Sequence, residues 1–135
     1  MTSAKALPLI VVACADAQTG VMLISSFAKD GFFTVLASTK DDLERAIVQN
    51  SGDKVVIYDE SMSLALAYKL LEARRSLPRS LQVYILGSCA DEDTEVSLLE
   101  AGARDYLHKP IRIRALLARV RKEALPVLPR PVQHG

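Results

Sequence analysis

The stretch Ala101-Gly102-Ala103-Arg104-Asp105-Tyr106-Leu107-His108-Lys109-Pro110 decides the fold of this chain. Gly102 is placed to end a helix, because glycine accepts the left-handed conformation common just past a helix. Residues 105–108 then form a short strand, and a Lys-Pro step closes it. Far upstream, Asp59 follows the β-branched run Lys54-Val-Val-Ile-Tyr58, which is a second strand pattern. Two predicted strands therefore end at charged residues, and the strand ends are the place to look for chemistry.

Outward from these two points, apolar runs alternate with amphipathic ones along the chain. The apolar runs are continuous rather than alternating, which predicts strands buried on both faces. The expected strands are residues 7–13, 33–37, 54–58, 81–86 and 105–108. Asp16 is expected to cap a helix that runs to about residue 29. Further helices are expected at 40–49, 63–76, 91–101 and 112–124.

Five strand–helix units in one chain predict an α/β fold. The expected architecture is (βα)5, a doubly wound five-stranded parallel sheet with right-handed crossovers and helices on both faces. Ligands of such sheets bind beyond the carboxyl ends of the strands. Residues 1–124 are expected to form one domain, and the Pro-rich residues 125–135 a tail or linker stub.

Composition narrows the class of protein. Half of the 135 residues are apolar, 24% are charged, and the net charge is +1, which is typical of an ordinary globular protein and not of a disordered or polyanion-seeking one. No apolar run approaches the ~20 residues of a membrane span, so a cytoplasmic location is expected. Cys14 and Cys89 are far apart and show no metal-binding spacing. The last expected helix, residues 112–124, is basic but lacks interleaved aromatic residues. We therefore expect its charged side to face solvent and the domain not to bind nucleic acid.

Asp59 after the third strand and Lys109-Pro110 after the fifth resemble the receiver domain of two-component response regulators, which has the flavodoxin-like, CheY-like fold. The resemblance covers roughly residues 7–124. It implies that Asp59 occupies the phosphoacceptor position, that Lys109 pairs with it, and that the Lys109–Pro110 bond is cis. It also places Tyr106 where receivers carry an aromatic switch, whose ring moves inward on phosphorylation. From the residues alone, Asp59 as a helix cap and Tyr106 as a half-buried sheet-edge residue remain alternatives.

The chain departs from the receiver pattern at three places. Receivers hold Mg²⁺ through two adjacent acids after the first strand, and here those positions are Ala13 and Cys14, which supply no oxygen ligand. The position of the phosphoryl-binding Thr or Ser after the fourth strand is Gly87. Residues 60–67 also lack the family's Pro and Gly. Without the metal, phosphoryl transfer would be slower by orders of magnitude, so no cofactor is expected.

Our first hypothesis is an atypical receiver, or pseudo-receiver, that acts in signal transduction through protein–protein interaction without phosphorylation. The face expected to bind is the fourth helix, fifth strand and fifth helix, where Asp105 and Arg119 match charged positions of related receivers. The partner would be an effector domain, a histidine kinase or a second copy in a homodimer, with no membrane contact. The alternative is a working phospho-receiver of a phosphorelay, phosphorylated on Asp59 by a histidine kinase, with Mg²⁺ held through Asp16 or Glu60.

A third hypothesis from another class is a small α/β enzyme or ligand binder on the same scaffold. The sequence offers no Gly-rich phosphate loop and no nucleophile paired with a His base, so we do not expect an enzyme. Cys14 leaves two interpretations open. Beside Lys109 its thiol would lose its proton more easily and respond to oxidation, whereas a cysteine at a strand end is more often buried and inert.

Overall fold

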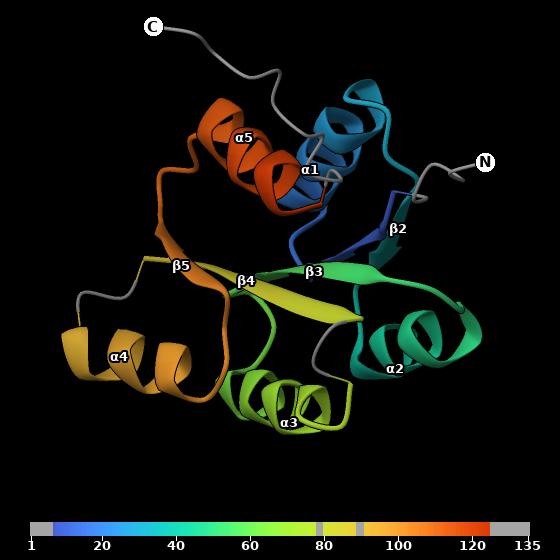
Figure 1. The fold of residues 1–135 in the computed structure, drawn as a ribbon. Helices are drawn as coiled ribbons and strands as arrows, with labels where there is room; N and C mark the ends of the chain where they lie inside the picture. Colours follow the sequence, from blue (N-terminus) through green and yellow to red (C-terminus); the bar gives the residue numbers. More distant parts are fainter. Residues whose placement is uncertain (1–6, 78–79, 89–90, 125–135) are drawn as a thin grey trace, which may run out of the picture.

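The computed structural model describes residues 7–77, 80–88 and 91–124, which form a five-stranded parallel sheet between two layers of helices (Figure 1). The predicted tail and Cys89 lie outside the described residues. In chain order the elements are β1 (Leu9–Ala13), α1 (Ala17–Lys29), β2 (Thr34–Ala37), α2 (Lys40–Gln49), β3 (Lys54–Asp59), α3 (Leu64–Arg74), β4 (Leu81–Gly87), α4 (Glu92–Glu100), β5 (Asp105–His108) and α5 (Ile113–Ala124).

The strand order across the sheet is β2-β1-β3-β4-β5, and every neighbouring pair is parallel. The predicted doubly wound (βα)5 sheet is therefore confirmed. The chain moves outward from β1 to β2 and then crosses back to β3, so the strand order changes direction between β1 and β3. In open α/β sheets that point opens a crevice at the carboxyl ends of the strands.

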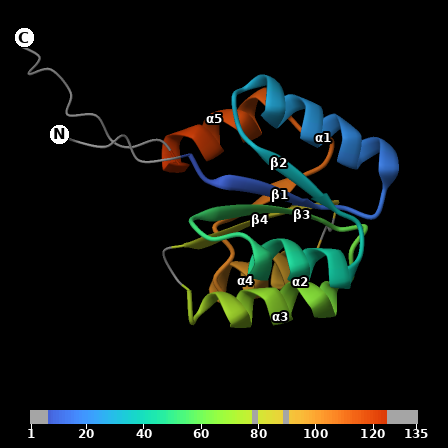
Figure 2. The same ribbon diagram turned by 90° about the vertical axis from the view of Figure 1, so that its right-hand side faces the viewer.

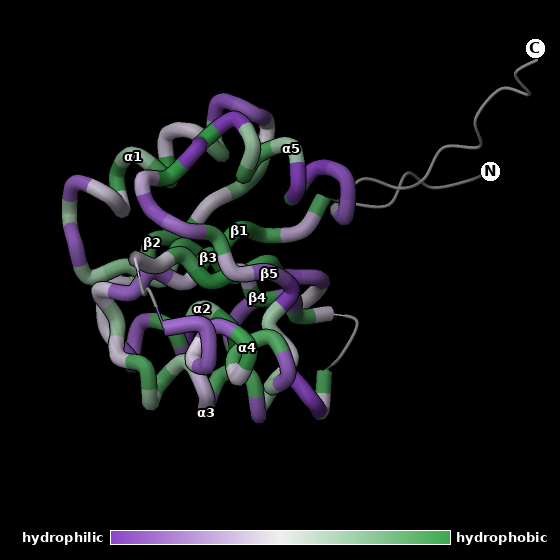
Figure 3. The backbone as a smooth tube through the Cα atoms, turned by 90° about the vertical axis from the view of Figure 1, so that its left-hand side faces the viewer, coloured by the Kyte–Doolittle hydropathy of each residue, from purple (hydrophilic) through white to green (hydrophobic). Residues whose placement is uncertain are grey.

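Helices cover both faces of the sheet and bury it. Helices α1 and α5 lie on one face, and α2, α3 and α4 lie on the other (Figures 1 and 2). Every residue of β3 is buried, because this strand lies at the centre of the sheet and alternate side chains enter the two cores. The hydropathy colouring in Figure 3 shows apolar strands between helices of mixed polarity. None of the described helices is long and apolar enough to cross a membrane.

Short-range signals set the limits of the helices. The predicted cap Asp16 is confirmed, since its carboxylate accepts a hydrogen bond from the backbone N–H of Thr19. Gly102 has a φ of 119° just past α4, the left-handed conformation for which glycine was expected there. Two predicted strands were too long at their starts, because the ladder of β1 begins at Leu9 and that of β2 at Thr34. β3 and β4 each extend one residue further than expected, to Asp59 and Gly87.

Candidate functional site

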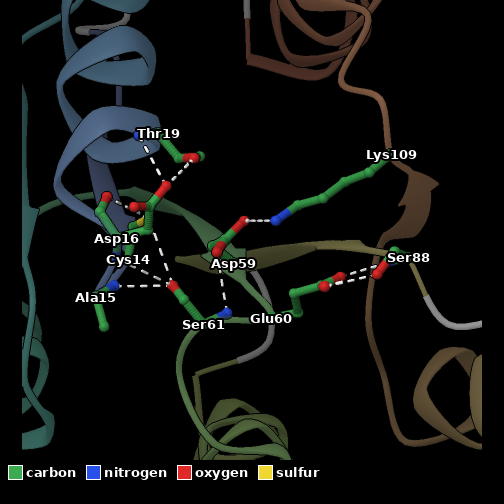
Figure 4. A network of polar contacts seen from close by, with 9 residues as sticks. All are labelled: Cys14, Ala15, Asp16, Thr19, Asp59, Glu60, Ser61, Ser88 and Lys109. Atoms are coloured by element: carbon green, nitrogen blue, oxygen red, sulfur yellow. Dashed lines mark hydrogen bonds and ion pairs between the residues drawn. The ribbon is translucent and has the colours of Figure 1, made fainter.

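The carboxyl ends of four neighbouring strands bring the predicted site residues together (Figure 4). β1 ends at Ala13 and is followed by Cys14, β3 ends at Asp59, and β4 ends at Gly87. Lys109 follows β5 and reaches across the end of β4 toward Asp59. The sheet order explains this gathering, because β3 lies between β1 on one side and β4 on the other.

Asp59 and Lys109 form an ion pair, as the sequence predicts. The ammonium Nζ lies 2.9 Å from Asp59 Oδ1, although its approach lies outside regular hydrogen-bond geometry. The Asp59 side chain is fully buried, whereas that of Lys109 is 26% exposed. The Lys109–Pro110 bond is cis, as the resemblance implies. A buried carboxylate thus has a counter-charge that still contacts water.

The two charges stabilise each other's ionised forms. Burial raises the pKa of Asp59, but the hydrogen bonding of Ser61 and the adjacent positive charge of Lys109 outweigh it, and the net pKa is lowered. Burial lowers the pKa of Lys109, and the neighbouring Asp59 carboxylate more than reverses this, so that pKa is raised. Both groups are therefore charged at neutral pH, and the charge of Lys109 is already neutralised by its partner.

Ser61 connects the β3 end to the β1 end, a contact that sequence reasoning missed. Its backbone N–H donates to Asp59 Oδ2 at 2.9 Å. Its hydroxyl oxygen accepts from the N–H of Ala15 at 2.9 Å and, less closely, from that of Asp16 at 3.4 Å. A serine two residues after a strand carries no signal that distinguishes it from any loop serine. Ser61 therefore joins two loops that are far apart in the sequence (Figure 4).

The two positions where receivers carry their acid pair are closed to solvent. Ala13 is fully buried and Cys14 is 1% exposed. The Cys14 thiol donates to the backbone carbonyl of Asp16 at 3.2 Å. Burial raises the pKa of this thiol, and the negative charge of Asp59 raises it further. Both effects disfavour the thiolate, which favours the interpretation of Cys14 as a buried and inert cysteine over that of an oxidation-prone one.

The two acids that the alternative hypothesis needs for a metal are engaged elsewhere. Asp16 binds both the N–H and the hydroxyl of Thr19, and these hydrogen bonds lower the pKa of Asp16. Glu60 accepts from the backbone N–H of Ser88 and, at 2.7 Å, from the Ser88 hydroxyl. Within the described residues there is no group of three or more His, Cys, Asp or Glu side chains able to hold a metal ion. A hard cation that requires several oxygen ligands does not fit this set.

Tyr106 lies on the edge strand β5, as the alternative expected, but it is buried at 7% exposure and not half-buried. Its ring belongs to the core cluster on the α2, α3 and α4 face of the sheet. The His108 ring meets it edge to face, with 5.0 Å between ring centroids. His108 Nε2 lies 2.6 Å from Glu95 Oε1 of α4, so the strand and the helix hold the tyrosine between them.

The α4, β5 and α5 elements carry paired charges at the surface. Asp105 and Arg119, which the sequence marked as charged positions of this face, pair with each other. Arg104 pairs with Glu123 in the same way. Exposed ion pairs contribute at most about 1 kcal/mol to stability. Their main effect is to fix the positions of charged groups on this face.

Comparison with known proteins identifies the family of this chain. A family model described as the response regulator receiver domain matches residues 11–121, so the chain belongs to the receiver domain family. The transcriptional regulatory proteins PrrA of Mycobacterium tuberculosis and Mycobacterium bovis are each 29% identical over 114 residues. That alignment covers 84% of this chain and 48% of each relative. The chain thus spans about half the length of the curated relatives it matches.

Solved receiver structures share the fold. The receiver domain of the Francisella response regulator 1452 has a TM-score of 0.75 and 26% identity, covering 87% of this chain and 96% of that one. The orphan response regulator HP1043 of H. pylori has a TM-score of 0.75 and 20% identity, covering 89% and 98%. An atypical orphan response regulator, described as having a phosphorylation-independent regulatory mechanism, has a TM-score of 0.71 and 20% identity, covering 86% and 94%. The last two likenesses concern the fold alone.

Proposed function

We propose that this receiver domain is a signalling module that binds its protein partner without phosphorylation of Asp59. The observation that carries the proposal is what faces Asp59 from the β1 side. That side presents a protonated thiol at Cys14 and two backbone N–H groups already bonded to Ser61. These groups are hydrogen-bond donors, whereas a divalent cation needs oxygen acceptors, and the Asp16 carboxylate in the same loop is already bonded to Thr19.

The missing acceptors matter because phosphoryl transfer depends on charge neutralisation. The metal is the largest local charge in such sites and supplies several kcal/mol of transition-state stabilisation. Each ~1.4 kcal/mol changes a rate tenfold, so its loss slows transfer by orders of magnitude. Lys109 does not compensate, because its charge already pairs with Asp59 at 2.9 Å. Asp59 is then a structural carboxylate at the centre of the site.

The face that we propose for the partner consists of α4, β5 and α5. The first turn of α4 is acidic, with Glu92, Asp93 and Glu95, and the last turn of α5 is basic. α4 also exposes two apolar side chains, Val96 at 41% and Leu99 at 37%. Apolar area within a rim of fixed charges is typical of protein-binding surfaces. The partner is an effector domain, a histidine kinase or a second copy of this chain.

Incubation with acetyl phosphate and Mg²⁺, followed by intact-mass measurement, tests the proposal. We expect no added phosphate, under conditions in which a receiver with the acid pair is fully labelled. Asp59→Asn is the matched control, and we expect its mass to be unchanged by the incubation, like that of the natural chain. A gain of one phosphate that disappears in Asp59→Asn would support the alternative, a phospho-receiver whose metal site uses Asp16 or Glu60.

Two further expectations remain proposals. Because the chain spans about half the length of its PrrA relatives, we propose that residues 1–124 are the receiver unit and that the Pro-rich residues 125–135 are the beginning of a linker to another domain. A cytoplasmic location remains a prediction from the sequence. Limited proteolysis of a longer natural chain would test the first proposal by cleavage within 125–135.

A further inference from the structure

The ring of Tyr106 lies in a space that exists because residue 87 is glycine. A Cβ atom built on Gly87 would lie 2.2 Å from the Tyr106 hydroxyl oxygen and 2.9 Å from Cζ. It would also lie 3.2 Å from Glu60 Oε2. Carbon atoms in ordinary contact are about 3.5–4.0 Å apart. Any side chain at position 87 would therefore displace the Tyr106 ring from its present place.

The backbone conformation at this position gives no reason for a glycine. The glycines there with positive φ are Gly31, Gly52 and Gly102, and Gly87 is not among them. Gly87 ends a regular β-strand, a backbone that any residue adopts and in which glycine is unfavourable. The conformation of the backbone thus does not require glycine, whereas the position of the tyrosine ring does.

The tyrosine is also enclosed from the side of β5. His108 lies two residues further along the strand, on the same face of the sheet, and its ring covers that of Tyr106. Glu95 of α4 holds His108 through the contact at 2.6 Å. For Tyr106 to turn outward, it would have to leave the space beside Gly87 and separate His108 from α4.

We propose that Gly87 holds Tyr106 inward in the unmodified protein, so that the α4, β5 and α5 face has one fixed form. Tyr106 is then part of the core instead of a mobile ring that responds to Asp59. Gly87 acts as a positioning residue for the partner surface. The inference concerns the regulation of the proposed interaction module, and it rests on the proposed function only for the identity of that surface.

Tyrosine nitration by tetranitromethane, mapped by mass spectrometry, reports the position of the ring directly. Tyr68 is partly exposed and serves as an internal reference, whereas Tyr58 and Tyr84 are buried. In the natural chain we expect Tyr106 to react at least about tenfold more slowly than Tyr68, because burial permits reaction only through local opening. In Gly87→Thr the rate at Tyr106 should rise at least about tenfold, toward that of Tyr68.

Ser88→Thr is the matched control, because it adds only a methyl group, one residue later, at a position that already carries a side chain. It should leave Tyr106 protected. Circular dichroism and a cooperative thermal transition establish that each variant is folded, and Gly87→Ala provides a smaller substitution if threonine prevents folding. Equal reactivity of Tyr106 and Tyr68 in the natural chain would overturn the proposal. So would a folded Gly87→Ala or Gly87→Thr protein in which Tyr106 stays protected.

This result is separate from the phosphodonor experiment. A protein that gained phosphate on Asp59 but kept Tyr106 protected before and after labelling would contradict the proposed function and leave the role of Gly87 intact. A protein that stayed unphosphorylated but had a freely reactive Tyr106 would support the proposed function and contradict the role of Gly87.

Discussion

The two sides of the Asp59 carboxylate are built from different interactions. On the β5 side a cation, Lys109, lies 2.9 Å from Asp59 Oδ1. On the β1 side, Ser61 joins the loops by hydrogen bonds to backbone N–H groups, and the side chains at Ala13 and Cys14 are buried. The β5 side thus supplies a positive charge to Asp59, whereas the β1 side supplies hydrogen bonds between loops. In this chain, hydrogen bonds through Ser61 hold the sheet edge together on the side where receivers carry their acid pair.

The largest expected effect comes from giving the β1 side the acids that it lacks. Ala13→Asp together with Cys14→Asp places two carboxylates in buried positions at the end of β1. We expect a loss of about 4 kcal/mol in the free energy of unfolding without metal. Saturating Mg²⁺ should then restore about 2–3 kcal/mol by binding the folded state. Urea unfolding with and without Mg²⁺ measures both effects.

The natural chain is the control for that variant and should show no Mg²⁺ dependence. The single change Cys14→Asp serves if the double variant does not fold. If a folded aspartate variant has the same free energy of unfolding with and without Mg²⁺, then Ala13 and Cys14 are not the positions that face a metal.

The second-largest loss in the free energy of unfolding is expected from removing the charge of Lys109 on the β5 side. Lys109→Met keeps most of the apolar stem but leaves the fully buried Asp59 carboxylate without its counter-charge. Breaking a buried pair in this way costs about 3–5 kcal/mol, and the partial exposure of Lys109 places the expected loss at about 3 kcal/mol. Lys122→Met on the exposed face of α5 is the control. Equal stabilities of the two variants would show that the ion pair contributes nothing.

A smaller loss is expected from Ser61→Ala, which removes the connection on the β1 side. The N–H groups of Ala15 and Asp16 would lose their acceptor. Because both groups are exposed and can bond to water instead, the cost is about 0.5–1.5 kcal/mol. Ser25→Ala on the exposed face of α1 is the matched control. Hydrogen exchange should also become faster at Ala15 and Asp16 and stay unchanged in β4. Unchanged protection at both amides would contradict the role of Ser61.

The smallest effect is the dependence of stability on pH. Burial opposes the charge of Asp59, but the hydrogen bonding of Ser61 and the adjacent Lys109 ammonium lower its pKa below the usual value. A lowered pKa in the folded state stabilises the fold above the unfolded pKa of about 3.9, and this contribution is lost as pH falls through the folded value. The stability difference between the natural chain and Asp59→Asn should therefore narrow on acidification. A constant difference down to about pH 3 would show that the pKa of Asp59 is not lowered.

The sheet and its helices were predictable because their signals are local. Continuous apolar runs mark each strand, and residues such as Asp16 and Gly102 mark helix ends through their own backbone chemistry. The starts of β1 and β2 were less predictable. Leu7 and Phe33 continue the apolar pattern, yet the ladder begins at Leu9 and Thr34 because pairing depends on the neighbouring strand.

The site was only partly predictable for a related physical reason. Asp59 and Lys109 each follow a strand, so the topology alone brings them to one edge. The connection through Ser61, the bond between Glu60 and Ser88, and the burial of Tyr106 depend on distances between loops and side chains. No periodicity in the sequence encodes such distances. From the sequence, Gly87 indicates only that the hydroxyl of the usual Thr or Ser is missing. In the structure, the same glycine leaves a space that the Tyr106 ring fills.

Binding of beryllofluoride, a phosphoryl mimic, tests the central claim most directly. Fluorine NMR of the protein with Mg²⁺ and beryllofluoride detects occupation of the Asp59 site without any catalytic step. We predict no bound fluorine resonance and no shift of the Ser61 and Lys109 amides, because the β1 side offers the cation a thiol at Cys14 and a carboxylate at Asp16 that is already bonded to Thr19. A saturable bound resonance that is absent in Asp59→Asn would contradict the account.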